Sequence, residues 1–115
     1  MQILKLVLSD YWFDEIKSGR KTHEYRKVSS FWLKRFSSSI LPYEIKELKR
    51  FPSSGHWSAP LWFYRNARVE FQRAYRKDPE RMTFKIQGVR ITSGHYTDLK
   101  CDCPVFDIEL GERVK

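Results

Sequence analysis

Residues 82–91, Met-Thr-Phe-Lys-Ile-Gln-Gly-Val-Arg-Ile, predict one long strand that bends near its middle. Apolar and polar residues alternate along 82–86, and the alternation resumes along 89–91 with the opposite parity. A change of parity across Gly88 is the pattern that a β-bulge produces, because one extra residue turns the following side chains to the other face. A bent strand of this kind favours a sheet that curls.

Shorter strands are predicted on both sides of this long one. Each is a run of alternating or mostly apolar residues, or of β-branched and aromatic residues: 3–8, 21–27, 69–75 and 106–110. A helix is predicted over about 10–18, because a Ser-Asp pair precedes it and a glycine follows it. A second helix of about two turns, residues 31–36, follows two serines that can cap it.

The chain of 115 residues has the length of one domain. Its hydrophobic content of 41%, with 16% aromatic residues, is sufficient for a packed core. About five strands and two to three short helices in so short a chain favour a small β-barrel or strongly curled sheet, with helices across one end. We therefore predict an α+β fold in a single domain that spans residues 1–115.

Residues 37–66 are predicted to form an irregular, aromatic-rich insertion in this domain. A run of serines, several prolines and a short helical-looking segment follow one another there without a consistent period. Four aromatic residues gather near its end, namely Trp57, Trp62, Phe63 and Tyr64. Packing on the core is the favoured role for this cluster, and a surface on which bases stack is the alternative.

The chain is basic, and its charge is unevenly distributed. It contains 22 Lys and Arg against 14 Asp and Glu, which gives a net charge of +8. Residues 98–115 hold five acidic and three basic residues, a local charge of −2, so that residues 1–97 carry +10. Such a field attracts polyanions by steering and by counterion release, which favours a nucleic acid or a nucleotide as the partner.

The sequence is expected to belong to a cytoplasmic protein. The apolar runs are only a few residues long, whereas a membrane-spanning helix needs about 20 residues, and no secretory signal is recognised at the N-terminus. Cys101 and Cys103 are one residue apart, a spacing that argues against an ordinary disulfide and favours a reducing compartment. Together with His95 they make only a partial ligand set for a metal, so neither a metal nor a cofactor is expected.

Residues 19–27, Gly-Arg-Lys-Thr-His-Glu-Tyr-Arg-Lys, contain the densest group of polar side chains. Basic residues at this place also suit the C-terminus of the preceding helix. Glu24 and Arg26 share one face of the predicted strand, whereas Lys21 would point to the other face of a regular strand. A site that combines all three therefore requires Lys21 to lie in the turn before the strand, which Gly19 makes sterically easy.

The four residues Gly19-x-Lys21-x-x-Glu24-x-Arg26 resemble the G-x-K-x-x-E-x-R signature of ASCH domains, a family of the PUA-like superfamily. The helix expected before the signature and the late strand at 106–111 also resemble elements of that family. The resemblance covers both ends of the chain, whereas the insertion has no counterpart that can be aligned.

This resemblance implies a small PUA-like β-barrel with a cleft beside the signature, in a family that binds RNA or acts on RNA or modified nucleosides. Some relatives remove an acyl group from the exocyclic amine of cytidine. In those relatives the lysine that matches Lys21 is catalytic, and a threonine stands at the position of Glu24. A second glutamate, from a downstream helix, has no obvious match here.

The leading interpretation is a domain that binds RNA or a nucleotide in a basic cleft. Its candidate binding residues are Arg20, Lys21, Glu24, Tyr25, Arg26 and Trp57. In this interpretation Lys21 and Arg26 contact phosphate, Glu24 accepts a hydrogen bond from a base or orients Arg26, and Tyr25 or Trp57 stacks on the base.

Two other interpretations remain open. One is a small hydrolase that acts on RNA or on an acylated nucleoside, as a ribonuclease or an amidohydrolase, in the same cleft. In that enzyme Lys21 would activate the nucleophile and Glu24 would carry the proton. The other is a protein-interaction module that uses the aromatic residues at 57–64 as its contact surface.

Overall fold

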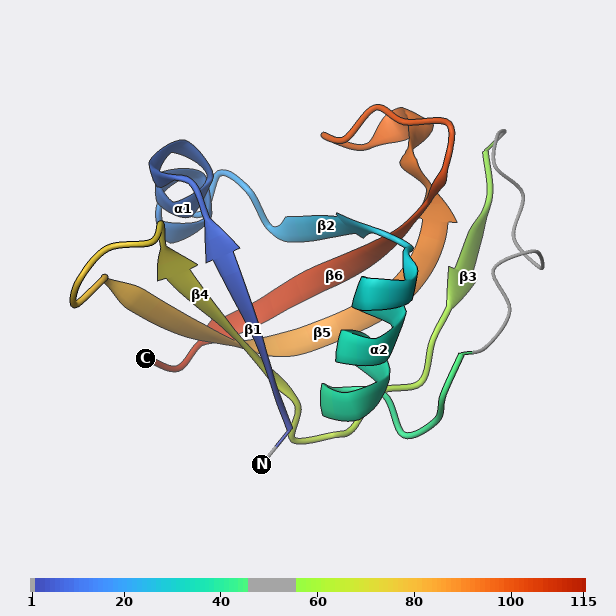
Figure 1. Ribbon diagram of the computed structural model, residues 1–115, viewed down its shortest axis with the longest axis horizontal. Coiled ribbons are helices and arrows are strands. Elements are labelled where there is room, and N and C mark those ends of the chain that lie inside the picture. The colour runs from blue at the N-terminus through green and yellow to red at the C-terminus, as the bar shows by residue number, and fades with distance from the viewer. Residues whose placement is uncertain (1, 46–55) are drawn as a thin grey trace.

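A computed structural model describes residues 2–45 and 56–115 of the chain. In this part, six strands and two α-helices follow one another in a single sheet-based fold (Figure 1). Their order is β1 (Ile3–Leu8), α1 (Asp10–Lys17), β2 (His23–Lys27), α2 (Ser30–Ser39), β3 (Ser58–Pro60), β4 (Arg68–Arg73), β5 (Arg81–Ser93) and β6 (Pro104–Arg113), with a 3₁₀ turn at Gly94–Tyr96 between the last two strands. The predicted α+β class with a small curled sheet is confirmed.

The strands are ordered β1-β4-β5-β6-β2 across the sheet, and the short β3 pairs with the second half of β5. β1 runs parallel to β4, and the other pairs are antiparallel. The register of β5 against β6 shifts between Phe84 and Gly88, which confirms the predicted bulge. β4 ends earlier than predicted because Ala74 adopts a φ of +51°, which regular strand backbone does not.

α1 lies over the end of the sheet formed by β1 and β4 and buries Phe13 and Ile16. Arg73, the last residue of β4, holds this helix from the other side. Its guanidinium contacts Asp10 (3.3 Å) and Asp14 (2.5 Å) of α1 and lies 4.4 Å from the ring centroid of Phe13. The hydrogen bond from Arg73 lowers the pKa of Asp14, which therefore remains ionised and keeps the helix attached.

α2 is longer than the predicted segment 31–36, because it continues through three serines to Ser39. Ser29 caps its start through its hydroxyl, and the hydroxyls of the last two serines donate to the carbonyl of Arg35. Serines that bond back to the preceding turn in this way are compatible with a helix.

Among the described residues no helix is both long and apolar enough to cross a membrane.

The core lies between the concave side of the sheet and the two helices, and part of the 37–66 insertion joins it. Trp57, Leu61 and Phe63 pack against the buried cluster, as the favoured interpretation of the aromatic residues expects. Trp62 and Tyr64 do not follow this interpretation, since they are 80% and 39% exposed and lie outside the residues packed on the core. β3 lies within the insertion and adds a strand to the five expected. The helical-looking segment predicted after Pro42 lies mostly outside the described residues.

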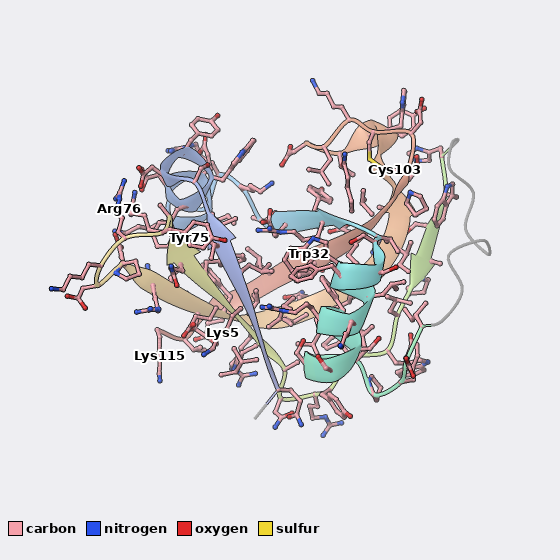
Figure 2. All side chains as sticks on the ribbon, viewed as in Figure 1. Lys5, Trp32, Tyr75, Arg76, Cys103 and Lys115 are labelled. Atoms are coloured by element: carbon pink, nitrogen blue, oxygen red, sulfur yellow. A yellow bond between two sulfur atoms is a disulfide. The ribbon has the colours of Figure 1, made fainter. Side chains whose placement is uncertain are left out.

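Cys101 and Cys103 form a disulfide in the loop between β5 and β6 (Figure 2). The prediction that these residues do not pair is wrong. The backbone turns between them, so that their Cα atoms are 5.3 Å apart, within the range of roughly 4.4–6.8 Å that a disulfide spans. The expectation of a reducing, cytoplasmic setting drew on this spacing and loses that support.

Candidate functional site

The polar residues of the signature lie where the two edge strands of the sheet, β1 and β2, face each other without pairing. Side chains occupy the space between these strands. The guanidinium of Arg26, on β2, donates to the carbonyl of Val7 on β1, with an Nη2–O distance of 3.2 Å. Beside this contact a cavity of about 440 Å³ opens to solvent between the ends of both strands, α1 and α2. Its size is within the range of about 300–1,000 Å³ for small-molecule sites.

The turn before β2 brings Lys21 to the same side as Glu24 and Arg26, as a combined site requires. Gly19 has a φ of +85° in this turn, a conformation that favours glycine. The amide of Lys21 donates to the carbonyl of Glu15 (3.0 Å), which attaches the turn to the end of α1. β2 begins only at His23, two residues later than predicted, so Lys21 is free of the alternation of the strand.

Three charged side chains meet at the floor of this cavity. The Arg26 Nη2 atom is 2.8 Å from Oε2 of Glu24, and the Nζ atom of Lys21 is 3.7 Å from Oε1. Glu24 is almost completely buried, with 7% of its side chain exposed, against 20% for Arg26. A carboxylate buried this deeply requires a cationic partner, and the sequence supplies one on each side.

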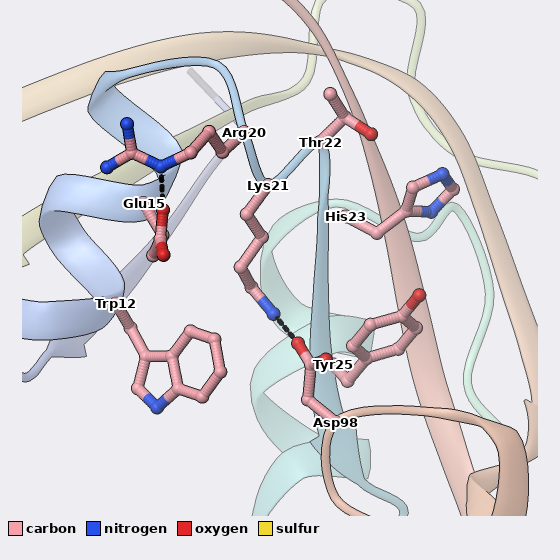
Figure 3. A pocket seen from close by; sticks show the side chains of 8 residues that line it. All are labelled: Trp12, Glu15, Arg20, Lys21, Thr22, His23, Tyr25 and Asp98. Carbon is pink, nitrogen blue, oxygen red and sulfur yellow. Dashed lines mark hydrogen bonds and ion pairs between the residues drawn. The ribbon is translucent and has the colours of Figure 1, made fainter.

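A second cavity, of about 330 Å³, adjoins the first and is centred on Lys21. The ammonium group lies 4.6 Å from the ring centroid of Trp12 and 5.0 Å from that of Tyr25, and it contacts the carboxylate of Asp98 (Figure 3). These four residues line both cavities, which we call together the cleft. The cleft thus combines aromatic planes with paired charges.

Other predicted site residues have different surroundings. Arg20 lines the smaller cavity, but its side chain is 68% exposed and is paired with Glu15. Tyr25 lines both cavities. Trp57 lines neither of them and packs against the core cluster. The predicted group is therefore brought together by the structure with the exception of Trp57.

The structure adds aromatic and acidic residues that the sequence analysis did not assign to the cleft. Trp12 of α1 and Trp32 of α2 form its walls, and the guanidinium carbon of Arg26 lies 5.0 Å from the ring centroid of Trp32. Asp98 and Leu99 reach it from the disulfide-containing loop. Trp12 stands in the helix directly before the signature turn, and this closeness in the sequence is a signal that could have been used, whereas Asp98 comes from a distant part of the chain.

Arg26 has hydrogen-bonding capacity that the protein does not use. Its Nη2 atom donates to Glu24 and to Val7, whereas its Nε atom is buried and has no hydrogen-bond partner in the described part of the chain. A buried unpaired donor is unfavourable, so this atom is available to donate to a bound ligand.

On the outer face of β2, His23 is held by carboxylates of β6. Its Nδ1 atom is 2.6 Å from Asp107, and its Nε2 atom is 3.7 Å from Glu109. Asp107 is buried because it lies against His23. The rings of His23 and Tyr25 stack with their centroids 6.1 Å apart. Tyr25 is therefore enclosed between His23 and Lys21.

Burial, reinforced by the carboxylates of Asp107, Asp98 and Glu24, raises the pKa of Tyr25 from 10.0 to about 12. The neutral phenol is thus favoured in the folded state. Its contribution to the free energy of unfolding is present below pH 10 and is lost as the pH rises from 10 to about 12, because the unfolded chain releases the proton first. Ultraviolet titration should show one phenolate that forms about two pH units late in the wild type and is missing in Tyr25→Phe. A Tyr25→Phe titration curve identical to that of the wild type would contradict the assignment.

Within residues 2–45 and 56–115 the side chains offer no group of three or more His, Cys, Asp and Glu arranged to hold a metal ion. In the cleft, Glu24 and Asp98 are both engaged by Lys21. The cleft can therefore offer a ligand aromatic faces, charge-assisted hydrogen bonds and a carboxylate acceptor. Comparisons with protein-family models, with curated proteins and with solved structures found no match for this chain.

Proposed function

We propose that the cleft binds a nucleotide, either free or as part of RNA. The observation that carries this proposal is the juxtaposition of Trp12, Tyr25 and Trp32 with the Lys21–Glu24–Arg26 group around one pair of adjoining cavities. A nucleotide has an apolar ring with a polar edge and, next to it, a negatively charged phosphate. These two parts match an aromatic-walled cavity that has two cations and a carboxylate acceptor at its floor.

Each part of a nucleotide has a partner in this arrangement. The base would stack on the indole of Trp12 or Trp32, since every base offers a π-face. Glu24 would accept a hydrogen bond from an amino or imino group of the base, while Arg26 holds the carboxylate in place. Lys21 would exchange Asp98, which is 41% exposed, for phosphate, because a phosphate offers the ammonium group a more highly charged acceptor than a carboxylate does.

The resemblance of residues 19–26 to the ASCH signature supports the same proposal. Gly19 and Lys21 lie in the turn before β2, and Glu24 and Arg26 lie on β2, which supports a joint role for these residues. The net charge of +8 is also suited to a polyanionic partner. Membership of that family, and RNA as the physiological partner, are part of this proposal.

Replacement of Lys21 by methionine should weaken nucleotide binding by about tenfold to a hundredfold, because a hydrogen bond to a charged group contributes about 1.5–3 kcal/mol. Glu24 keeps Arg26 as its partner and Asp98 is 41% exposed, so this variant is expected to fold. Isothermal titration calorimetry with the four ribonucleoside monophosphates measures the effect. Lys77→Met is the matched control, because Lys77 is exposed and has no acidic partner in the described structure. Equal affinities for both variants would contradict the proposal.

Hydrolysis in the same cleft is the second candidate function, and one observation favours it: an amine and a buried carboxylate, those of Lys21 and Glu24, lie 3.7 Å apart beside a cavity. The conservative variant Lys21→Arg separates this candidate from binding. A guanidinium preserves the positive charge, so binding should change only a few fold, but it cannot serve as a base. If wild-type protein cleaves RNA or deacylates nucleosides and Lys21→Arg does not, the cleft is catalytic.

A further inference from the structure

Among the described residues, some basic side chains have an acidic partner and others do not. All three acidic residues of α1 have basic partners, which are Arg73 and Arg76 for Asp10, Arg73 for Asp14 and Arg20 for Glu15. By contrast, neither β1 nor α2 contains an acidic residue. Four cations on or next to these elements have no acidic partner in the part of the chain that the structure describes: Lys5, Lys27, Lys34 and Arg35.

Two of these residues, Arg35 of α2 and Lys5 of β1, are joined through the backbone of Lys5. The guanidinium of Arg35 donates to the carbonyl of Lys5, with an Nη2–O distance of 3.1 Å. Lys5 lies on β1 and Trp32 on α2 (Figure 2). The side chains of Lys5, Lys34 and Arg35 are all exposed. Exposed cations without an acidic partner in the described residues therefore lie on both β1 and α2, although such cations also occur elsewhere, for example at Lys77 and Arg81.

Aromatic rings lie within this charged surface. Phe31 is 59% exposed, and the guanidinium carbon of Arg35 lies 5.6 Å from its ring centroid. Phe31 is also in edge contact with Trp32, with ring centroids 4.9 Å apart. We call Lys5, Phe31, Lys34 and Arg35 the α2 face. Because Trp32 lines the cleft and touches Phe31, the α2 face begins where the cleft ends.

From these contacts we infer that the α2 face binds the nucleotides that flank the one in the cleft, so that the ligand is a single-stranded polynucleotide. This inference rests on the proposed function. A positively charged track interleaved with aromatic side chains is the arrangement by which proteins bind single strands, since the cations neutralise phosphates and the rings stack on bases. A free nucleotide would fill the cleft and leave the cations of the α2 face without a partner.

Charge complementarity selects this ligand over an acidic protein. Lys27, which also has no acidic partner in the described residues, lines the aromatic-walled cavity itself, and Trp32 of that cavity contacts Phe31 of the α2 face. An acidic protein segment would satisfy the charges but would leave the cavity and the exposed ring of Phe31 unused. The repeating unit of a polynucleotide, a base with a phosphate, suits the cations, the cavity and the exposed ring alike.

The test compares the double variant Lys34→Ala/Arg35→Ala with Lys77→Ala/Arg81→Ala. Both remove two exposed cations without an acidic partner among the described residues, but the second pair lies around the β4–β5 turn, at the opposite end of the molecule from α2 (Figure 1). Alanine favours the helix at positions 34 and 35, so the first variant is expected to fold. Each protein is titrated with the four ribonucleoside monophosphates and with homo-oligoribonucleotides of about eight nucleotides, a length in the range of single-strand sites.

The inference predicts that Lys34→Ala/Arg35→Ala binds the oligonucleotide about tenfold more weakly. The slope of log affinity against log salt should fall in magnitude by about 1.4, because two phosphates of the single strand are no longer neutralised. Monophosphate affinity should not change. An oligonucleotide affinity equal to that of the wild type, or an equal loss in the Lys77→Ala/Arg81→Ala control, overturns the inference. If Lys21→Met still weakens monophosphate binding in that case, the proposed function stands. If the wild type binds neither probe, the proposed function and the inference both fail.

Discussion

Phe36→Ala should lower the free energy of unfolding by about 3–5 kcal/mol, the largest effect that we expect from any single substitution in this protein. Phe36 is completely buried, and its ring stacks on that of Phe106 with centroids 3.9 Å apart and an interplanar angle of 10°. This contact attaches α2 to β6, the strand that pairs with β2. Its loss leaves a cavity under the helix that forms one wall of the cleft.

Urea denaturation of Phe31→Ala provides the matched control for this experiment. Phe31 belongs to the same helix and loses the same atoms, but it is 59% exposed, so its replacement should change the free energy of unfolding by no more than about 0.5 kcal/mol. Comparable losses in the two variants would show that the stacked pair does not anchor α2.

Arg26→Met should be the second most destabilising change, by about 3 kcal/mol, because it leaves the buried carboxylate of Glu24 without its closest partner. Lys21 remains 3.7 Å away and also serves Asp98, so it replaces Arg26 only in part. The double variant Glu24→Leu/Arg26→Met removes both charges and should recover most of this loss. Apolar side chains of similar size fill the buried space without the cost of desolvating an ion.

The affinity of the same double variant for nucleotides tests whether the ion pair takes part in ligand recognition. If the ion pair is present for ligand recognition, Glu24→Leu/Arg26→Met should be nearly as stable as the wild type and yet bind nucleotides at least about tenfold more weakly. Denaturation and calorimetry on the same sample measure both quantities. A double variant that is as unstable as Arg26→Met would contradict the coupling of the two residues. A double variant that binds nucleotides like the wild type would show that Glu24 and Arg26 do not contribute to recognition.

Local patterns predicted most of the fold because the interactions behind them are local. A short run of mostly apolar residues predicted β1 in full, and the parity change at Gly88 predicted the bulge in β5. Gly19 marked the end of α1, and its left-handed conformation creates the turn that lets Lys21 join Glu24. Because Lys21 would face away from Glu24 in a regular strand, strand geometry also indicated that a combined site requires such a turn.

The errors have physical causes that lie outside local patterns. The disulfide depends on a bend of the loop between β5 and β6, which residue spacing does not reveal. The three serines at the end of α2 have little intrinsic preference for helix, and they become helical because Phe36 and the residues beside it are buried against the sheet. Trp57 was a reasonable stacking residue by composition, but the path of β3 along β5 turns it toward the core.

Hydrophobic period, capping and the conformational freedom of one glycine are local properties, and they were enough to predict the signature turn and the type and order of the elements other than β3. The surroundings of that turn depend instead on tertiary packing. Curling of the sheet brings its two unpaired edges, β1 and β2, to opposite sides of one space, and it brings Trp12, Trp32 and Asp98 from three separate segments to its walls. Contacts between segments far apart in the chain depend on how all the elements pack together, and no window of the sequence contains that information.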